Sequence, residues 1–125
     1  MKINGYHHVA LFSQDMEKSL KLYLGLGGKI VHSFGTPERT INLVDLGGNA
    51  VLEIIPDGKG VPEVDPHLPH ICLRTDDVDE AFATAIKFGA IPKSEPTDHN
   101  LNGMQARNAF VFGPDNEQVE FFCVK

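Results

Sequence analysis

An internal repeat constrains the fold of this chain more than any other feature of its 125 residues. A shift of 62 residues, the distance from His8 to His70, aligns segment 8–11 with segment 70–73. A shift of 67 residues, the distance from Glu53 to Glu120, aligns segment 49–54 with segment 116–121. The sequence therefore consists of two diverged copies of one module.

The copies, module one (about 5–56) and module two (about 68–124), predict the same order of elements. Segment 57–67 is rich in Pro, Gly and charge and is typical of a linker. The strands predicted from apolar and β-branched runs are 6–12, 29–34, 41–46 and 50–55 in module one, and 68–75, 91–94, 109–113 and 118–124 in module two. Each module is then βαβββ, and the chain is an α+β protein forming a single domain over 1–125.

The helix of each module is predicted from its cap, its apolar stripe and its glycine exit. Asp15 and Asp77 are typical N-caps, and glycines follow the periodic segments at 27–28 and 89. Apolar residues recur at helical spacing in both segments. The stripes are Met16, Leu20, Tyr23 and Leu24 in module one, and Val78, Phe82, Ala85 and Ile86 in module two.

Alternation along the strands separates the polar residues that can bind a metal from the aliphatic ones. Side chains of a strand point to opposite faces in turn, so one parity holds the aliphatic residues that suit a helix. The other parity holds two histidines and two glutamates, each at matching places in the two modules: His8, Glu53, His70 and Glu120. We expect these four side chains to point away from the helices, toward a cavity between the sheets.

Two imidazoles and two carboxylates are ordinary ligands of a divalent cation of borderline softness. Zinc, nickel, cobalt, manganese and ferrous iron all accept this set. Four protein ligands leave an octahedral ion two positions for water or substrate, which a catalytic site requires. Taken alone, any one of these residues is interpreted as a hydrogen-bonded or solvated side chain. The occurrence of the same residue types at matching places in both modules favours the metal site.

Other positions on the cavity face predict a mixed apolar pocket. Phe12 and Phe122 are candidate substrate contacts, and the Arg74 guanidinium suits a carboxylate or phosphate, or a salt bridge to a surface acid. Cys72 is predicted to line the pocket, because nothing nearby in sequence would activate its thiol.

The remaining histidines lack support from the repeat. His7 has the parity of the aliphatic face and is interpreted as a strand-end residue. His32, His67 and His99 have no matching partner in the other module. His99 lies in a polar segment, 97–103, which predicts either a surface turn or a loop that covers a pocket as a lid.

Composition excludes several classes of function. Eleven Lys and Arg against 17 Asp and Glu give a net charge of −6 without a basic cluster, which argues against nucleic acid. No apolar run approaches the length of a membrane span, and the N-terminal residues do not resemble a secretory signal, so the cytoplasm is the expected location. Cys72 and Cys123 do not form a metal clip or a disulfide framework.

Taken together, these segments resemble the vicinal oxygen chelate superfamily of glyoxalase I, bleomycin resistance proteins and dioxygenases, and glyoxalase I in particular. The resemblance spans nearly the whole chain. The segments that carry it are 8–11, 15–20, 52–54, 70–73 and 113–121.

The resemblance implies that the modules form half-open barrels, with a homodimer in which His8 and Glu53 of one chain meet His70 and Glu120 of its partner. It implies a metal, with nickel or zinc first. The implied activity is a lactoylglutathione lyase-type reaction, in which Glu120 or Glu53 moves a proton on a 2-oxoaldehyde thiol adduct and the metal stabilises an enediolate.

Within the superfamily, other activities remain alternatives: an epimerase, a dioxygenase, or a bleomycin-resistance-type binding protein without catalysis. Glu53 favours glyoxalase I over methylmalonyl-CoA epimerase, which commonly has Gln there. Members that use glutathione tend to carry Arg and Asn where this chain has Phe12 and Asp57. Another thiol or another oxygenated substrate therefore stays open.

Overall fold

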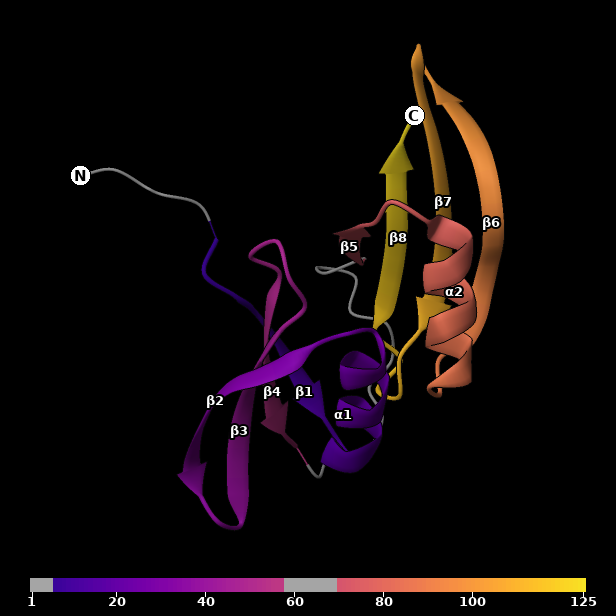
Figure 1. Ribbon diagram of the computed structural model, residues 1–125. Helices are drawn as coiled ribbons and strands as arrows, with labels where there is room; N and C mark the ends of the chain where they lie inside the picture. Colours follow the sequence, from indigo (N-terminus) through magenta and orange to yellow (C-terminus); the bar gives the residue numbers. More distant parts are fainter. Residues whose placement is uncertain (1–5, 58–69) are drawn as a thin grey trace, which may run out of the picture.

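The computed structural model describes residues 6–57 and 70–125. Figure 1 shows the elements as two groups, each with one helix against one sheet. In chain order they are β1 (Val9–Ser13), α1 (Met16–Gly25), β2 (Lys29–Thr36), β3 (Arg39–Asp45), β4 (Val51–Pro56), β5 (Ile71–Arg74), α2 (Val78–Lys87), β6 (Ile91–Leu101), β7 (Met104–Phe112) and β8 (Gln118–Val124). No helix in the described ranges has both the length and the apolar character that a membrane span needs.

The two sheets have the same topology, which confirms two tandem βαβββ modules and an α+β fold. The strand orders are β1-β4-β3-β2 and β5-β8-β7-β6, each in an open four-stranded sheet. In each sheet the first and last strands of the module pair in parallel, with Ala10 opposite Glu53 and Cys72 opposite Glu120. The repeat seen in the sequence is therefore a repeat of strand register.

Both helices begin at the predicted aspartates. The Asp15 carboxylate accepts a hydrogen bond from Lys18 N at 3.2 Å, and the Asp77 carboxylate accepts one from Glu80 N at 2.9 Å. Gly27 and Gly89 follow the helices with φ of 97° and 109°, a conformation that glycine adopts without steric cost. The caps and exits in both modules are confirmed.

The apolar stripe of α1 differs from its prediction by one position. Leu22 is 1% exposed and belongs to the core, whereas Leu24 is 38% exposed. Leu22 lies between the two faces of the periodic pattern. Leu22 belongs to the hydrophobic cluster shared by both modules, and α1 contacts helix α2 as well as its own sheet, so the buried surface of α1 is wider than the predicted stripe.

A single hydrophobic cluster joins the two modules. Its buried members come from both halves: Leu11, Leu22, Tyr23, Val44, Leu52 and Ile54 from module one, and Val78, Ala85, Ala90, Ala109, Val111, Val119 and Phe121 from module two. The helices approach closely at Gly25, where a Cβ atom would collide with the Phe88 ring. The aliphatic face of each sheet is thus the face that the helices cover.

The turn between β7 and β8 also connects the modules, through polar contacts. The Asp115 carboxylate is 5% exposed and accepts hydrogen bonds from Gln14 N at 2.6 Å and Ser19 Oγ at 3.2 Å. Tyr23 OH donates to Glu117 Oε2 at 2.8 Å. Burial raises the pKa of both the Tyr23 hydroxyl and the Glu117 carboxyl above their usual ranges.

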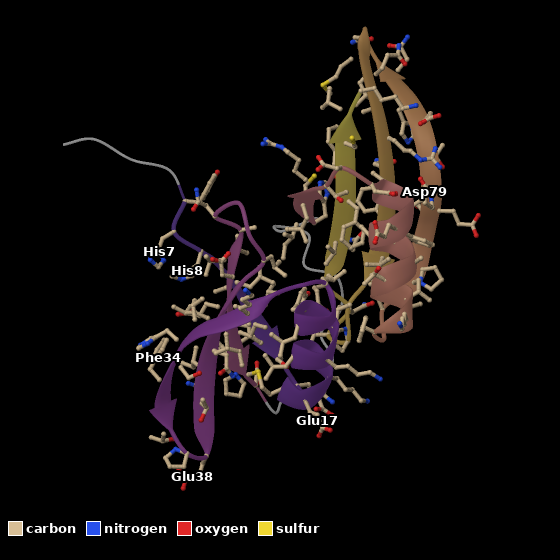
Figure 2. All side chains as sticks on the ribbon, in the orientation of Figure 1. His7, His8, Glu17, Phe34, Glu38 and Asp79 are labelled. Carbon is tan, nitrogen blue, oxygen red and sulfur yellow. The ribbon has the colours of Figure 1, made fainter. Side chains whose placement is uncertain are left out.

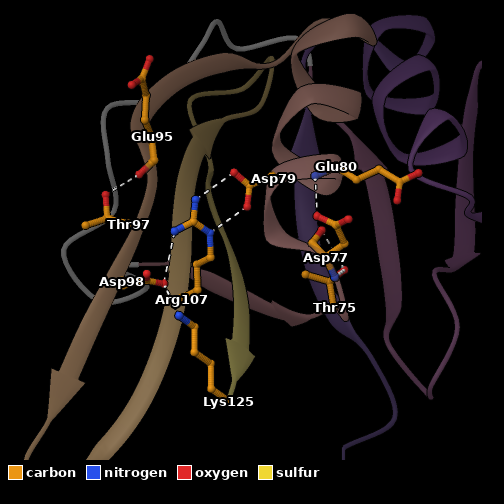
Figure 3. A network of polar contacts seen from close by, with 9 residues as sticks. All are labelled: Thr75, Asp77, Asp79, Glu80, Glu95, Thr97, Asp98, Arg107 and Lys125. Carbon is orange, nitrogen blue, oxygen red and sulfur yellow. Dashed lines mark hydrogen bonds and ion pairs between the residues drawn. The ribbon is translucent and has the colours of Figure 1, made fainter.

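An ion-pair network braces the helix of module two on its sheet (Figure 3). Arg107 on β7 donates two hydrogen bonds to Asp79 on α2, at 2.7 and 2.8 Å. Asp98 on β6 forms ion pairs through Oδ1 with Arg107 Nη1 at 3.2 Å and with Lys125 Nζ at 2.8 Å. These cations hold the pKa of Asp79 and of Asp98 below its usual range, mainly through the hydrogen bonds they donate.

Several predicted boundaries are wrong, and one interpretation with them. Segment 97–103 is not a loop, because strand β6 continues to Leu101 and a tight turn reaches β7 at Met104. The lid interpretation is therefore wrong. Polar residues dominate this hairpin because its tip is exposed, which hid the strand pattern. The predicted linker 57–67 lies outside the described residues apart from Asp57.

Candidate metal centre

His70 and Glu120 form the closer of two histidine–glutamate pairs. His70 immediately precedes β5, and Glu120 lies in the middle of the adjacent parallel strand β8. The distance from His70 Nε2 to Glu120 Oε1 is 3.1 Å. The Glu120 side chain is 10% exposed, while the imidazole is 39% exposed and stands edge-on to the Phe110 ring. This carboxylate is the most enclosed of the predicted ligands.

His8 and Glu53 form the equivalent pair in module one. His8 precedes β1, and its Nε2 lies 3.7 Å from Glu53 Oε1. Its Nδ1 lies 2.9 Å from Nδ1 of His7. Figure 2 shows His7 and His8 on the side of the first sheet away from α1. His8 and Glu53 therefore form a pair on the open face, which is the face that strand alternation predicts for them.

The two pairs do not meet within one chain. In the part of the chain that the structure describes, no group of three or more His, Cys, Asp or Glu side chains is arranged to hold a metal ion. Each pair belongs to the open face of its own sheet, because the cluster that joins the modules packs against the opposite faces. The chain thus presents two separate histidine–glutamate pairs, called half-sites below.

The donors of each pair suit a divalent ion, and the separation in module two also matches the spacing of two ligands on one ion. Nitrogen and oxygen ligands that lie about 2.1 Å from an ion at right angles to one another are separated by about 3 Å. The separation in module two is 3.1 Å, and that in module one is 3.7 Å. A neutral imidazole nitrogen and a carboxylate oxygen are the donors that nickel and zinc accept.

The predicted substrate contacts lie around these pairs on the open faces. Phe12 on β1 is 59% exposed, Arg74 on β5 is exposed, and Phe122 on β8 is half-buried. Their exposure leaves apolar and cationic surface available to a ligand or to another chain.

Cys72 is exposed on β5, opposite Glu120. Its pKa is raised to about 11, first by partial desolvation and then by the charge of Glu120 and a hydrogen bond to it, with Arg74 opposing. The thiol is therefore protonated at neutral pH and is a poor nucleophile, as predicted.

Sequence reasoning missed Asn108 next to the pairs, and it interpreted His99 only as part of a surface turn or a lid. Asn108 on β7 donates from Nδ2 to Glu120 Oε2 at 2.8 Å. His99 on β6 lies with Nε2 2.8 Å from Asn108 Oδ1. Asn108 lies just outside the predicted strand 109–113, so the alternation of that strand did not assign it to a face; a strand that begins at Met104 places it on the open face. His7 is the third neighbour, interpreted as a strand end only.

The other two histidines do not join a half-site. His32 stacks on Phe34 along strand β2, with ring centroids 5.7 Å apart. His67 lies outside the described residues.

Comparison with known proteins identifies the family to which this architecture belongs. The model of the glyoxalase/bleomycin resistance protein/dioxygenase superfamily matches residues 5–121. The chain belongs to this superfamily. A search of curated protein sequences finds no match.

Among solved structures, members of the superfamily show the same fold. A glyoxalase family protein from Enterococcus faecalis is 21% identical, with a TM-score of 0.76 over 98% of this chain and 99% of that one. The trypanothione-dependent glyoxalase I of Leishmania major is 25% identical, with a TM-score of 0.75 over 97% of this chain and 87% of that one. A glyoxalase I mutant from Zea mays is 17% identical, with a TM-score of 0.72 over 93% of this chain but 44% of that one.

Proposed function

We propose that this chain is a metal-dependent isomerase or lyase of the glyoxalase I type, working as a homodimer. The observation that carries the proposal is the pairing of His70 with Glu120 at 3.1 Å, repeated by His8 with Glu53 on the matching face of the other module. A homodimer that brings the first pair of one chain to the second pair of its partner supplies four ligands to one ion.

The proposed substrate is a 2-oxoaldehyde joined to a thiol. A bound divalent ion would supply Lewis acidity, which makes the carbon-bound proton more acidic and stabilises the enediolate left by its loss. Glu120 removes the proton from the carbon that bears the hydroxyl and the thiol sulfur, and returns it to the neighbouring carbonyl carbon. Glu53 is the alternative base at the matching position.

The residues around the pairs suit such a substrate in part. Arg74 on the open face of module two offers a guanidinium to a carboxylate of the thiol compound, and the rings of Phe12 and Phe122 offer apolar contact. The structurally similar Leishmania enzyme is described as trypanothione-dependent, which makes a thiol other than glutathione a candidate for this chain. We therefore leave the thiol of this chain to experiment.

The test is metal reconstitution followed by an ultraviolet assay. The protein is stripped with a chelator, reloaded separately with nickel and zinc, and mixed with methylglyoxal and either glutathione or another thiol. We expect thioester formation with at least one thiol, only in the reloaded protein. A protein that binds neither metal would contradict the proposal and favour a metal-free binding module. Metal binding without activity toward any thiol would favour an epimerase.

A further inference from the structure

Four polar side chains cross the sheet of module two in spatial order, three from its strands and one from the residue just before β5. The strand order is β5-β8-β7-β6, and the residues are His70 before β5, Glu120 on β8, Asn108 on β7 and His99 on β6. Each is diagonal to the next. Asn108 pairs with Phe122, two residues from Glu120, and His99 pairs with Ala106, two residues from Asn108. Diagonal neighbours on one face are within reach of long polar side chains.

The chemistry of these groups fixes the direction of every hydrogen bond. An ionised carboxylate only accepts, so the Asn108 amide must present Nδ2 to Glu120 Oε2, as it does at 2.8 Å. Asn108 Oδ1 then faces His99 Nε2 at 2.8 Å and accepts a hydrogen bond from it. The His99 ring is therefore required to carry its proton on Nε2.

The contacts divide the two oxygens of Glu120 between two tasks. Oε2 is occupied by Asn108, while Oε1 is turned toward His70 Nε2 at 3.1 Å. Glu120 is 7% exposed, and a buried carboxylate is held where its hydrogen bonds are. Hydrogen bonds to a metal-binding carboxylate from outside the ligand set orient it and change metal affinity.

We propose that Asn108 is a positioning residue that holds Glu120 through Oε2, and that His99 keeps the Asn108 amide in the orientation this requires. The inference rests on the proposed function where it concerns the metal, because it treats Glu120 as a ligand. The hydrogen-bonded chain itself does not depend on that function, and the two are tested separately.

The first measurement follows the imidazole nitrogens of His99 by NMR in ¹⁵N-labelled protein, in mildly alkaline buffer without metal. In the unmodified chain we expect the Nε2–H tautomer to dominate. Asn108→Leu keeps the number and branching of the side-chain heavy atoms and removes the acceptor, so the tautomer preference relaxes. Glu120→Gln allows the amide of Asn108 to turn. The relaxation then appears at His99, which two hydrogen bonds connect to position 120. His32, on the edge strand of module one, is the internal control.

The second measurement is a Co²⁺ titration followed by visible absorption. Asn108→Leu is expected to weaken Co²⁺ binding by about 10- to 100-fold and to alter the spectrum. His99→Ala should weaken it less, and should have no further effect in the Asn108→Leu background, because His99 acts through Asn108. Asn100→Ala and His32→Ala are matched controls that leave the spectrum unchanged. Circular dichroism checks the fold of each variant.

The outcomes separate the inference from the function on which part of it rests. If neither Asn108→Leu nor Glu120→Gln changes the tautomer populations of His99, the inference is overturned. Unchanged Co²⁺ affinity in Asn108→Leu would also overturn it. If the unmodified chain binds no Co²⁺, the proposed function fails; the NMR result then decides whether Asn108 and His99 hold Glu120.

Discussion

The two modules share a topology and a histidine–glutamate pair, but the carboxylate of that pair has different surroundings in each module. In module two, Glu120 is held by Asn108 at 2.8 Å and faces His70 at 3.1 Å. In module one, the corresponding strand pairing sets Leu43 opposite Glu53, just as Phe110 lies opposite Glu120. Ile41 therefore occupies the place of Asn108 and cannot donate a hydrogen bond. Among the described residues, the side-chain contact recorded for Glu53 is the one with His8 at 3.7 Å.

The final turns of the modules show the same contrast. Both turns place an asparagine in the left-handed region, Asn49 with φ of 66° and Asn116 with φ of 64°. The turn of module one is exposed at Gly47–Asn49, while the turn of module two is docked on α1 through Asp115. The comparison teaches that the two copies share their backbone and their histidine–glutamate pairs, while the supporting contacts differ.

The largest expected effect tests which of the two carboxylates, Glu120 or Glu53, contributes more to turnover. Glu120→Gln should lower turnover of the reconstituted enzyme by about 100- to 10,000-fold, because an amide cannot accept the substrate proton. Glu53→Gln should lower it less, since Glu53 is held by fewer contacts and a preorganised group contributes more. Steady-state kinetics measure both, with Glu95→Gln on the exposed strand β6 as control. A larger loss in Glu53→Gln would reverse the proposed ranking.

A complementation experiment tests whether the two half-sites belong to one centre. His8→Ala and His70→Ala should each be inactive alone. Mixed under conditions that exchange subunits, they should recover about a quarter of the unmodified activity, because half of the dimers then carry one intact site. Activity is measured after mixing and compared with each variant alone. Continued inactivity in a mixture proven to exchange subunits would exclude a site shared in this way.

The docked turn predicts an effect on stability rather than activity. In Gly113→Ala the new Cβ would collide with the carboxylate of Glu117. That carboxylate cannot move without losing its hydrogen bonds from Tyr23 OH and from the backbone N–H of residue 115. We expect a loss of about 1–3 kcal/mol in the free energy of unfolding, measured with urea. The matching change in the open turn is Gly48→Asn, which tolerates a positive φ and meets no atom. It should be nearly neutral, and equal losses would remove the contrast between the turns.

The smallest effect concerns pH and again the docked turn. The pKa of Glu117 is raised in the folded chain above its ordinary value of 4.5, mainly by burial. The folded state therefore binds a proton more readily than the unfolded one, and this group adds stability as pH falls through the raised pKa toward 4.5. Glu117→Gln should lose that rise, which urea midpoints between neutral and mildly acidic pH can measure. If the urea midpoints of the unmodified chain and of Glu117→Gln change in parallel with pH, the raised pKa of Glu117 is contradicted.

The sequence predicted the module, the caps and the pairing partners because each depends on local pattern. Alternation placed Glu53 and Glu120 on the open faces, and the repeat matched them to His8 and His70. The helix caps follow from short-range hydrogen bonds of Asp15 and Asp77. These features need only neighbours along the chain or the same position in the other copy.

Features that depend on contacts between distant strands were not predicted. Asn108 and His99 meet only because β6 and β7 form a long hairpin, whose polar tip resembles a loop in sequence. Leu22 is buried in a cluster to which both modules contribute, which the period of one helix does not reveal. The separation of the half-sites likewise follows from how the sheets are arranged around the shared cluster.

That shared cluster has a consequence for how the duplicated unit can behave. Each copy is about fifty residues long, a size at which a core of its own is marginal. Asp115 would lose both Gln14 and Ser19 if the halves came apart, leaving an ionised group stripped of its partners. We therefore expect denaturant to melt the protein in one cooperative transition, so that an ancestral copy with this interior had to associate with a second in order to persist.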